Sequence, residues 1–215
     1  MTSVSRILGV SALALAATFA ADRASALTAL TAFEGGTPYS SYYTATPGDM
    51  IGWRFSIAAP IMLTALGVLD DGDLVSPHMV GLWGGGTLLA SQEIDAVEGT
   101  LLSGFYYESI TPVALAAGTY TIAAYYHGDD QDSYISGATS TSFDPAVTWL
   151  ASLYPAGESL GFVEPTLTSG SRGRFGPNFQ FSASVVATPL PGAAALLAGG
   201  LAAFGALGAA RRRRA

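Results

Sequence analysis

Ile51–Gly52–Trp53–Arg54–Phe55–Ser56–Ile57 is the part of the sequence that indicates the fold most clearly. Large apolar side chains alternate in it with small or polar ones, which is the pattern of a β-strand with one buried face. A second stretch, Thr119–Tyr120–Thr121–Ile122–Ala123–Ala124–Tyr125–Tyr126, is mostly apolar on both faces. We therefore expect Trp53 to lie in the core and the second stretch to be a central strand of its sheet.

Similar short runs, punctuated by Gly, Pro and Asp, continue along residues 27–184. They predict strands over residues 31–33, 51–57, 61–69, 78–83, 88–94, 104–110, 113–115, 119–126 and 175–184. Gly84–Gly85–Gly86 is expected to form a hairpin turn, 144–154 to contain one helical turn, and 155–174 to be an irregular loop. The sequence thus predicts an all-β fold, a single antiparallel β-sandwich of jelly-roll type.

The N-terminal end has the features of an export signal. A positive charge precedes the apolar run 7–19, and Ala24–Ser25–Ala26 has the small-x-small pattern of a signal-peptidase site. We therefore expect residues 1–26 to be a signal peptide that signal peptidase removes, so that the mature chain begins at Leu27. The alternatives are a cleavage site nearer Ala20 and an uncleaved anchor, although such a short apolar run spans a bilayer poorly.

Residues 185–215 form a three-part tail. The tripeptide Pro189, Leu190, Pro191 precedes an uncharged segment, 193–210, and four arginines follow that segment. At about 1.5 Å per residue the segment makes a helix about 27 Å long, near the lower limit for crossing a bilayer. The arginines would hold that end in the cytoplasm as a stop-transfer signal: Arg211, Arg212, Arg213 and Arg214. We therefore expect a C-terminal transmembrane helix and an extracytoplasmic region between the two ends.

This tail resembles the PEP-CTERM sorting signal of Gram-negative bacteria, in the variant with a Val-Pro-Leu-Pro-Ala-type motif. Here Pro-Glu-Pro is absent, and Ala187 and Thr188 separate Val186 from the first proline. The resemblance implies recognition by an exosortase-type transpeptidase that removes the helix and the arginines, and association with exopolysaccharide or biofilm. The alternative is an unprocessed single-pass anchor. Because Ala and Gly contribute little insertion energy, a segment built mostly of them is a marginal anchor, which favours processing.

The central region is strongly acidic. Residues 27–187 contain 15 acidic side chains and three arginines, Arg54, Arg172 and Arg174, for a net charge of about −12. That charge disfavours attraction to nucleic acid or to anionic lipid. The chain has neither cysteine nor lysine, which excludes disulfides, thiolate chemistry and Schiff bases.

Several short segments of the central region look like an uncharacterised β-sandwich domain that is common in PEP-CTERM proteins. They are residues 66–70, 78–83, 86–91, 105–107, 111–113, 115–120 and 176–181. These are mostly turn and core positions, so the resemblance implies the fold and brings no catalytic residues with it.

Two acidic clusters each place three carboxylates within four residues. Asp70, Asp71 and Asp73 follow one expected strand, and the second cluster, at 129–132, follows another. Calcium prefers about six to eight oxygen ligands, which carboxylates and loop carbonyls supply. The sequence therefore suggests a calcium site at the first cluster and, less strongly, at the second. Neither cluster has the spacing of an EF-hand loop, and the alternative for both is a solvated turn.

Acid–base catalysis has few candidates. His78 and His127 are the two histidines, and each neighbours an acidic cluster. An Asp–His pair can orient an imidazole for catalysis, but the sequence has neither a Gly-x-Ser-x-Gly elbow nor a His-Glu-x-x-His motif. Hydrogen bonding at strand ends is therefore the expected role of both. No spacing marks any two glutamates as the carboxylate pair of a glycosidase.

Aromatic residues offer a binding alternative. Tyr42 and Tyr43 lie in a polar stretch, while residues 106–107 and 125–126 are tyrosine pairs on expected strands. Adjacent strand residues point to opposite faces, so the two members of each pair face apart. By analogy with carbohydrate-binding modules, Tyr42, Tyr43, Tyr107 and Tyr126 are candidates for stacking on sugar rings. The alternative is ordinary core packing, which we expect for Trp53 and Trp83.

These features predict an exported, non-catalytic protein of the envelope or extracellular matrix of a Gram-negative bacterium. Its precursor would be anchored in the inner membrane at least transiently before it reaches the cell surface or the medium. The first alternative is a carbohydrate-binding module for extracellular polysaccharide, and the second, less favoured, is a polysaccharide hydrolase. Calcium is the one cofactor that the sequence suggests, and nucleic acid is not an expected partner.

Overall fold

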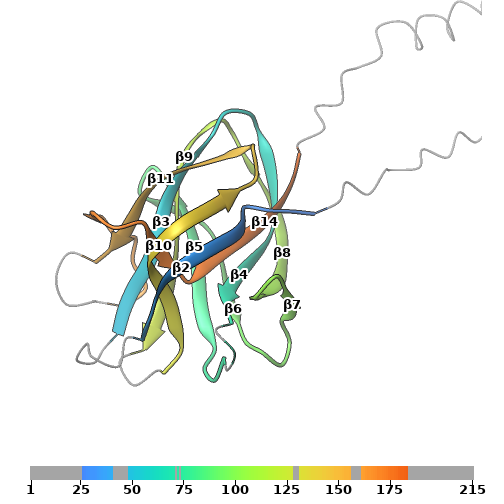
Figure 1. Ribbon diagram of the computed structural model, residues 1–215. Helices are drawn as coiled ribbons and strands as arrows, with labels where there is room; N and C mark the ends of the chain where they lie inside the picture. Colours follow the sequence, from blue (N-terminus) through green and yellow to red (C-terminus); the bar gives the residue numbers. More distant parts are fainter. Residues whose placement is uncertain are drawn as a thin grey trace, which may run out of the picture.

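The computed structural model describes residues 26–40, 48–70, 72, 74–127, 131–155 and 161–183. Within these residues the protein consists of fourteen strands and no helix, and the strands form antiparallel sheets of six, five and three strands (Figure 1). The predicted all-β, antiparallel class is confirmed. No helix of membrane-spanning length and hydropathy occurs in this described part. The expected signal helix and C-terminal helix lie outside the described residues.

The three sheets are built from strands that are distant in sequence. The six-stranded sheet has the order β12 (Leu167–Ser169), β11 (Val147–Tyr154), β3 (Gly48–Ile57), β9 (Gly118–His127), β5 (His78–Gly84) and β6 (Thr87–Ile94). The five-stranded sheet has the order β1 (Leu27–Thr28), β14 (Pro177–Ala183), β4 (Ile61–Leu69), β8 (Phe105–Leu115) and β7 (Thr100–Leu102). The three-stranded sheet has the order β13 (Gly173–Phe175), β10 (Ser133–Phe143) and β2 (Leu30–Ser40).

One apolar core joins the two larger sheets. Trp53 and Phe55 of β3 are fully buried and pack on Phe179 of β14, with ring centroids 6.0 and 4.8 Å apart. The indole nitrogen of Trp53 also donates a 2.8 Å hydrogen bond to the carbonyl of Pro177. Burial of a large apolar side chain contributes about 1.5–3 kcal/mol. The alternation seen in the sequence of β3 therefore supplies contacts that hold the sheets face to face.

A smaller cluster covers the opposite face of the six-stranded sheet. Met50, Trp83 and Ala123 form it, and each is the chain neighbour of a residue in the main core. Because successive strand residues point to opposite faces, these three side chains lie on the outer face. Phe162, from the segment after β11, packs on Trp83 with ring centroids 5.2 Å apart. Trp83 is thus buried as expected, but in this outer cluster rather than in the main core.

The strands expected from the sequence are present, with some changes of length. β4 has the predicted bounds, β9 lies between β3 and β5 as a central strand should, and the glycine-rich turn joins β5 to β6. The two segments expected at 104–110 and 113–115 form one strand, β8. Other parts differ from expectation: β1, β7 and β10 were not predicted, β11 replaces the helical turn expected at 144–154, and β12 and β13 interrupt the loop expected at 155–174.

The first and last described strands are neighbours in the five-stranded sheet. Leu27 of β1 is paired with Phe181 of β14, so the first and last strands run side by side (Figure 1). We call the end of the five-stranded sheet at which Ile61 is paired with Ala183 its terminal end. The opposite end, where Leu69 is paired with Phe105, is the loop end, and it carries the connection from β4 to β5.

Candidate functional site

A cleft of about 430 Å³ lies between β6 and β8. Its lining consists of residues 89–92 of β6 together with 109–111 and Val113 of β8. Side chains alternate between the two faces of a strand, so consecutive residues line a cleft only where the strand presents its edge. β6 is the last strand of its sheet, and β7 pairs only with residues 105–107 of β8. The cleft therefore lies between two strand edges that pair with no described strand on that side.

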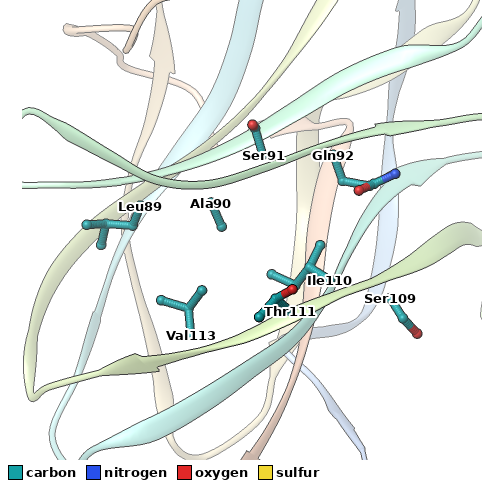
Figure 2. Close-up of a pocket in the computed structure, with 8 residues that line it drawn as sticks. All are labelled: Leu89, Ala90, Ser91, Gln92, Ser109, Ile110, Thr111 and Val113. Carbon is teal, nitrogen blue, oxygen red and sulfur yellow. The ribbon is translucent and has the colours of Figure 1, made fainter.

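The cleft has an apolar floor and a polar rim. Ala90, Ile110 and Val113 pack against the main core. Figure 2 shows Ala90 and Val113 pointing into the space between the strands, whereas Ser91 and Ser109 point away from it. None of the lining residues is aromatic, acidic, basic or a histidine. This lining can hold an apolar chain or offer hydroxyl groups, but it contains no general acid or base.

A side-chain hydrogen bond connects the two strands beside the cleft. The Gln92 amide nitrogen donates to one carboxylate oxygen of Glu108 across a distance of 2.7 Å, and the Asp95 backbone N–H approaches the other oxygen at 3.4 Å. Glu108 thus fixes the spacing of β6 and β8 at this point. Apart from Gln92, the residues that line the cleft take no part in the Gln92–Glu108 hydrogen bond. Among them no described side-chain hydrogen bond joins β6 to β8.

The buried histidine is part of a polar cluster at the loop end. His78 opens β5, and its Nε2 lies 3.0 Å from Asp132 Oδ2 while its Nδ1 lies 3.0 Å from the carbonyl oxygen of Tyr125. Asp132 also accepts the backbone N–H groups of Val75 and Ser76, both at 2.8 Å. The Tyr125 carbonyl and the Asp132 carboxylate thus contact the two ring nitrogens of His78 and fix the orientation of the ring.

This cluster is structural in character. His78 and Asp132 are both buried, with exposed fractions of 0% and 2%, so neither is open to a substrate. Together they join the β4–β5 connection to the start of β10. The predicted hydrogen-bonding role of His78 is confirmed. His127 ends β9, as predicted, and its ring packs edge-on against Tyr125 at 4.8 Å.

The acidic cluster proposed for calcium is described only in part. Asp70 accepts the backbone N–H groups of Gly72 and Leu74, at 3.0 and 3.3 Å, in a side-chain-stabilised turn. Asp71 and Asp73 lie outside the described residues. Among the residues that the structure does describe, no three His, Asp or Glu side chains converge as a metal site. Calcium binding by the first cluster stays a prediction.

The structure corrects two of the four candidate sugar-stacking residues. Tyr107 and Tyr126 are only 4% and 0% exposed, so their rings are core residues and are not available for stacking on a ligand. Glycines make room for both: a Cβ on Gly67 would meet the Tyr107 ring, and one on Gly176 would meet the Tyr126 hydroxyl. The sequence showed that each pair faces apart but not which member faces the core. Tyr42 and Tyr43 lie outside the described residues.

A surface that sequence reasoning missed brings two of the three central arginines onto aromatic rings. The Arg172 guanidinium lies 4.9 Å from the centre of the Trp149 ring, and that of Arg174 lies 5.3 and 5.2 Å from the rings of Tyr134 and Tyr154. We call Tyr39, Tyr134, Trp149, Tyr154, Arg172 and Arg174 the Arg–aromatic surface. The sequence did show that arginines are scarce in this acidic region, which could have drawn attention to Arg172 and Arg174. It could not show their aromatic partners, because these come from strands that are distant in sequence.

The backbone conformation and the side-chain contacts of Arg174 fix its position on this surface. Its backbone φ is 64°, in the left-handed region that non-glycine residues rarely adopt. Its Nη1 donates a 2.7 Å hydrogen bond to the Tyr134 hydroxyl, and Tyr39, which is 52% exposed, stacks on the same ring. Burial raises the pKa of Tyr134, an effect that the positive charge of Arg174 partly opposes. Within the described part of the chain neither Arg172 nor Arg174 forms an ion pair with a carboxylate.

Comparison with known proteins found no matching family model, no similar curated protein and no similar solved structure. Function therefore has to be argued from the residues of this chain.

Proposed function

We propose that this protein is an exported, non-catalytic module of the cell envelope or extracellular matrix. In this proposal a single β-sandwich of jelly-roll type is freed from a C-terminal sorting signal by an exosortase-type transpeptidase. One observation carries the proposal: the first described strand begins at Leu27, directly after the expected signal-peptidase site. Leu27 is paired with Phe181 and is 37% exposed, so cleavage before it would leave every described strand intact.

The polar groups of the described region favour a role without catalysis. His78 and Asp132, the one described histidine–carboxylate pair, are enclosed and hold two connections together. The cleft between β6 and β8 has no titratable lining residue. Enzymes that hydrolyse polysaccharides need an acid and a second carboxylate at an accessible site. The alternative of a polysaccharide hydrolase therefore has no support among the described residues.

The intact mass of the protein recovered from its own host tests the proposal. We expect a species that begins at Leu27 and ends near Pro191, present at the cell surface or in the medium. A species that retains Arg211 to Arg214 would contradict processing and leave a membrane-anchored module. A species that retains residues 1–26 would contradict the signal peptide itself.

A second candidate function, binding of an acidic polysaccharide, is favoured by the Arg–aromatic surface. Aromatic rings stack on the apolar faces of sugars, and guanidinium groups bind carboxylates through paired hydrogen bonds. Tyr39 is exposed, Arg172 is exposed, and neither arginine of the surface is neutralised by a described carboxylate. Tyr39, Trp149 and Tyr154 replace the buried Tyr107 and Tyr126 as the aromatic component of this alternative, while the buried Tyr134 holds Arg174 in place.

Affinity electrophoresis distinguishes this second function from a purely structural role. We expect polygalacturonate in the gel to slow the full-length chain, and neutral dextran to leave its mobility unchanged. Arg172→Gln and Tyr39→Ala should each weaken the retardation by about fivefold to tenfold, since each removes one ligand contact worth about 1 kcal/mol. Arg54→Gln, the change at the one central arginine outside the surface, is the matched control. Equal retardation of all three variants would contradict binding at this surface.

A further inference from the structure

No described strand pairs with the outer edge of β6, and this edge has few of the features that protect edge strands. Proteins normally shield an edge strand with lysine, proline, a bulge or a covering segment. β6 contains no lysine or proline, and Glu93 is its one charged residue. A bulge interrupts its pairing with β5 next to Leu89, which leaves the segment from Ala90 to Ile94 as a regular edge. Alternate backbone N–H and C=O groups of this segment therefore point away from β5, and no described strand pairs with them. One carbonyl of the segment, that of Glu93, accepts the Gln92 side-chain amide at 3.1 Å.

The edge of β8 across the cleft is much less suited to pairing. Pro112 lies in the part of β8 that borders the cleft, and proline has no backbone N–H to donate. The pairing of β8 with β4 also shifts register in this region, between Leu63 and Ala65 of β4. An incoming strand would therefore form its backbone hydrogen bonds with β6. The apolar residues of β8 would serve only as a floor beneath it.

The stretch of chain that contains β6 and β7 carries several exposed apolar side chains. In the stretch from β6 to β7 five large apolar residues are between 37% and 92% exposed: Leu88, Leu89, Val97, Leu101 and Leu102. An added strand would place alternate side chains toward the cleft floor, over Ala90 and Val113. The combination of a free edge with an apolar floor is the arrangement that proteins use to bind extended peptides by strand addition.

The charges near this edge indicate the kind of strand that would bind. Glu93 and Glu98 are exposed, and Asp95 and Glu108 are partly exposed. The sequence has no lysine at all and no arginine between Arg54 and Arg172, so no basic side chain in this stretch offsets these carboxylates. A second copy of the chain would bring the same negative edge, which like charges disfavour. A partner with lysine or arginine on alternate residues complements the edge.

We propose that β6 is a docking edge for an extended, basic segment of a partner protein, which adds to the six-stranded sheet as a further strand. Its apolar residues face Ala90 and Val113, and its basic residues face outward, toward Glu93. This docking edge is separate from the Arg–aromatic surface, and it is independent of tail processing.

Hydrogen exchange of the full-length chain tests the docking edge. The probe is an acetylated, amidated peptide of alternating lysine and valine, about eight residues long, which is a typical strand length. At about ten times its Kd the peptide should slow exchange of the amides of residues 87–94 that point away from β5 by about tenfold, because bound amides are protected in proportion to occupancy. Two control peptides are an alternating glutamate–valine peptide and a lysine–valine peptide with N-methyl groups on alternate residues, which cannot pair.

Reversal of the edge charge gives the decisive comparison. Glu93→Lys should abolish protection by the lysine–valine peptide and create protection by the glutamate–valine peptide, whereas Glu34→Lys on exposed β2 should change neither. An unchanged thermal midpoint would show that both variants fold. The proposal is overturned by equal protection from all three peptides, or by no protection at millimolar peptide. Protection, without peptide, of those amides of residues 87–94 that point away from β5 would also overturn it, because the outer edge would then be occupied by the chain itself or by a second copy.

Discussion

At the scale of single residues, Asn178 is the polar side chain on which the fold depends most directly. It is fully buried in β14, and its amide oxygen accepts the backbone N–H groups of Leu30 and Phe179 at 3.1 and 2.9 Å. Its amide nitrogen donates to the carbonyl oxygen of Leu30 at 2.9 Å. The side chain thus pairs with the first residue of β2 as a neighbouring strand would, and it joins the three-stranded sheet to the five-stranded sheet.

Replacement of this amide should be costly. We expect Asn178→Ala to lower the free energy of unfolding by about 2–4 kcal/mol, because it leaves buried backbone groups of Leu30 without hydrogen bonds. Gln180→Ala, two residues further along β14, is the control and should change the free energy by no more than about 0.5 kcal/mol. Urea denaturation followed by tryptophan fluorescence measures both. Similar losses in the two variants would show that Asn178 has no special role.

Tyr107 should make stability sensitive to alkaline pH. Burial raises the pKa of Tyr107 well above its ordinary value, and the side chain of Thr28 opposes this only in part. A tyrosine whose pKa is higher in the folded state than in the unfolded state contributes its full stabilisation at pH values below the unfolded pKa, which is near 10. That contribution is lost progressively as the pH rises through and above the unfolded pKa. The unfolded state ionises first, so the loss from this residue reaches about 1.4 kcal/mol at pH 11.

A phenylalanine variant isolates this effect. Tyr107→Phe should have nearly the wild-type thermal midpoint at pH 8 and a higher midpoint than wild type at pH 11, since it removes the ionising group and keeps the ring. Tyr39→Phe, at an exposed position, should follow the wild-type pH profile. Parallel profiles for wild type and Tyr107→Phe would contradict the assignment of alkaline sensitivity to Tyr107.

At the scale of elements, the segment after β11 is held to the six-stranded sheet by close packing at Gly81 of β5. A Cβ at this position would meet the Trp83 ring and the Phe162 ring, whose Cζ atom would be 2.6 Å away. We expect Gly81→Ala to lower the free energy of unfolding by about 1–3 kcal/mol through overpacking. Gly118→Ala, at the start of β9, is a matched control because the nearest atom to its Cβ would be 3.7 Å away. Urea midpoints of the two variants test the difference, and equal midpoints would contradict it.

Elements with large apolar side chains in alternation could be predicted from the sequence, and those held by small residues could not. β10 is rich in Ser and Thr, and it is a strand because it pairs along its length with β2. β2 itself continues through Gly35 and Gly36, whose φ values are 64° and 86°. The pairing of β2 with β10 is irregular near these glycines, where the register shifts between Ala138 and Ser140. A pattern that looks like a loop locally thus becomes a strand when a distant partner supplies the hydrogen bonds.

The candidate sites depended even more on distant contacts. The cleft exists because β6 and β8 are the edges of two different sheets, and strand order across sheets is not visible in local periodicity. The Arg–aromatic surface likewise combines β2, β10, β11 and β13, of which only part of β2 was predicted. His78 at a strand start was predicted correctly because its role follows from its position beside a turn.

At the scale of the whole molecule, charge is the property that links stability to environment. The region from Leu27 to Ala187 carries about −12, so repulsion among its carboxylates opposes the compact state. Added salt screens such repulsion, with a Debye length of about 10 Å at 0.1 M. At the loop end Asp132 of the second acidic cluster binds the backbone of Val75 and Ser76, which follow the first cluster in the chain. Screening of the repulsion between carboxylates and binding of calcium at a specific site would both stabilise the loop end. An experiment therefore has to distinguish the two effects.

Thermal unfolding at matched ionic strength separates them. We expect sodium chloride to raise the thermal midpoint of the full-length chain by about 2–4 °C, which corresponds to roughly 1 kcal/mol for a protein of this size. If Asp70, Asp71 and Asp73 bind calcium, calcium chloride at the same ionic strength raises the midpoint further, magnesium chloride does not, and Asp73→Asn removes the extra increase while leaving the response to sodium. Equal midpoints in sodium, magnesium and calcium would leave screening as the whole effect, and the first acidic cluster would then be a solvated turn.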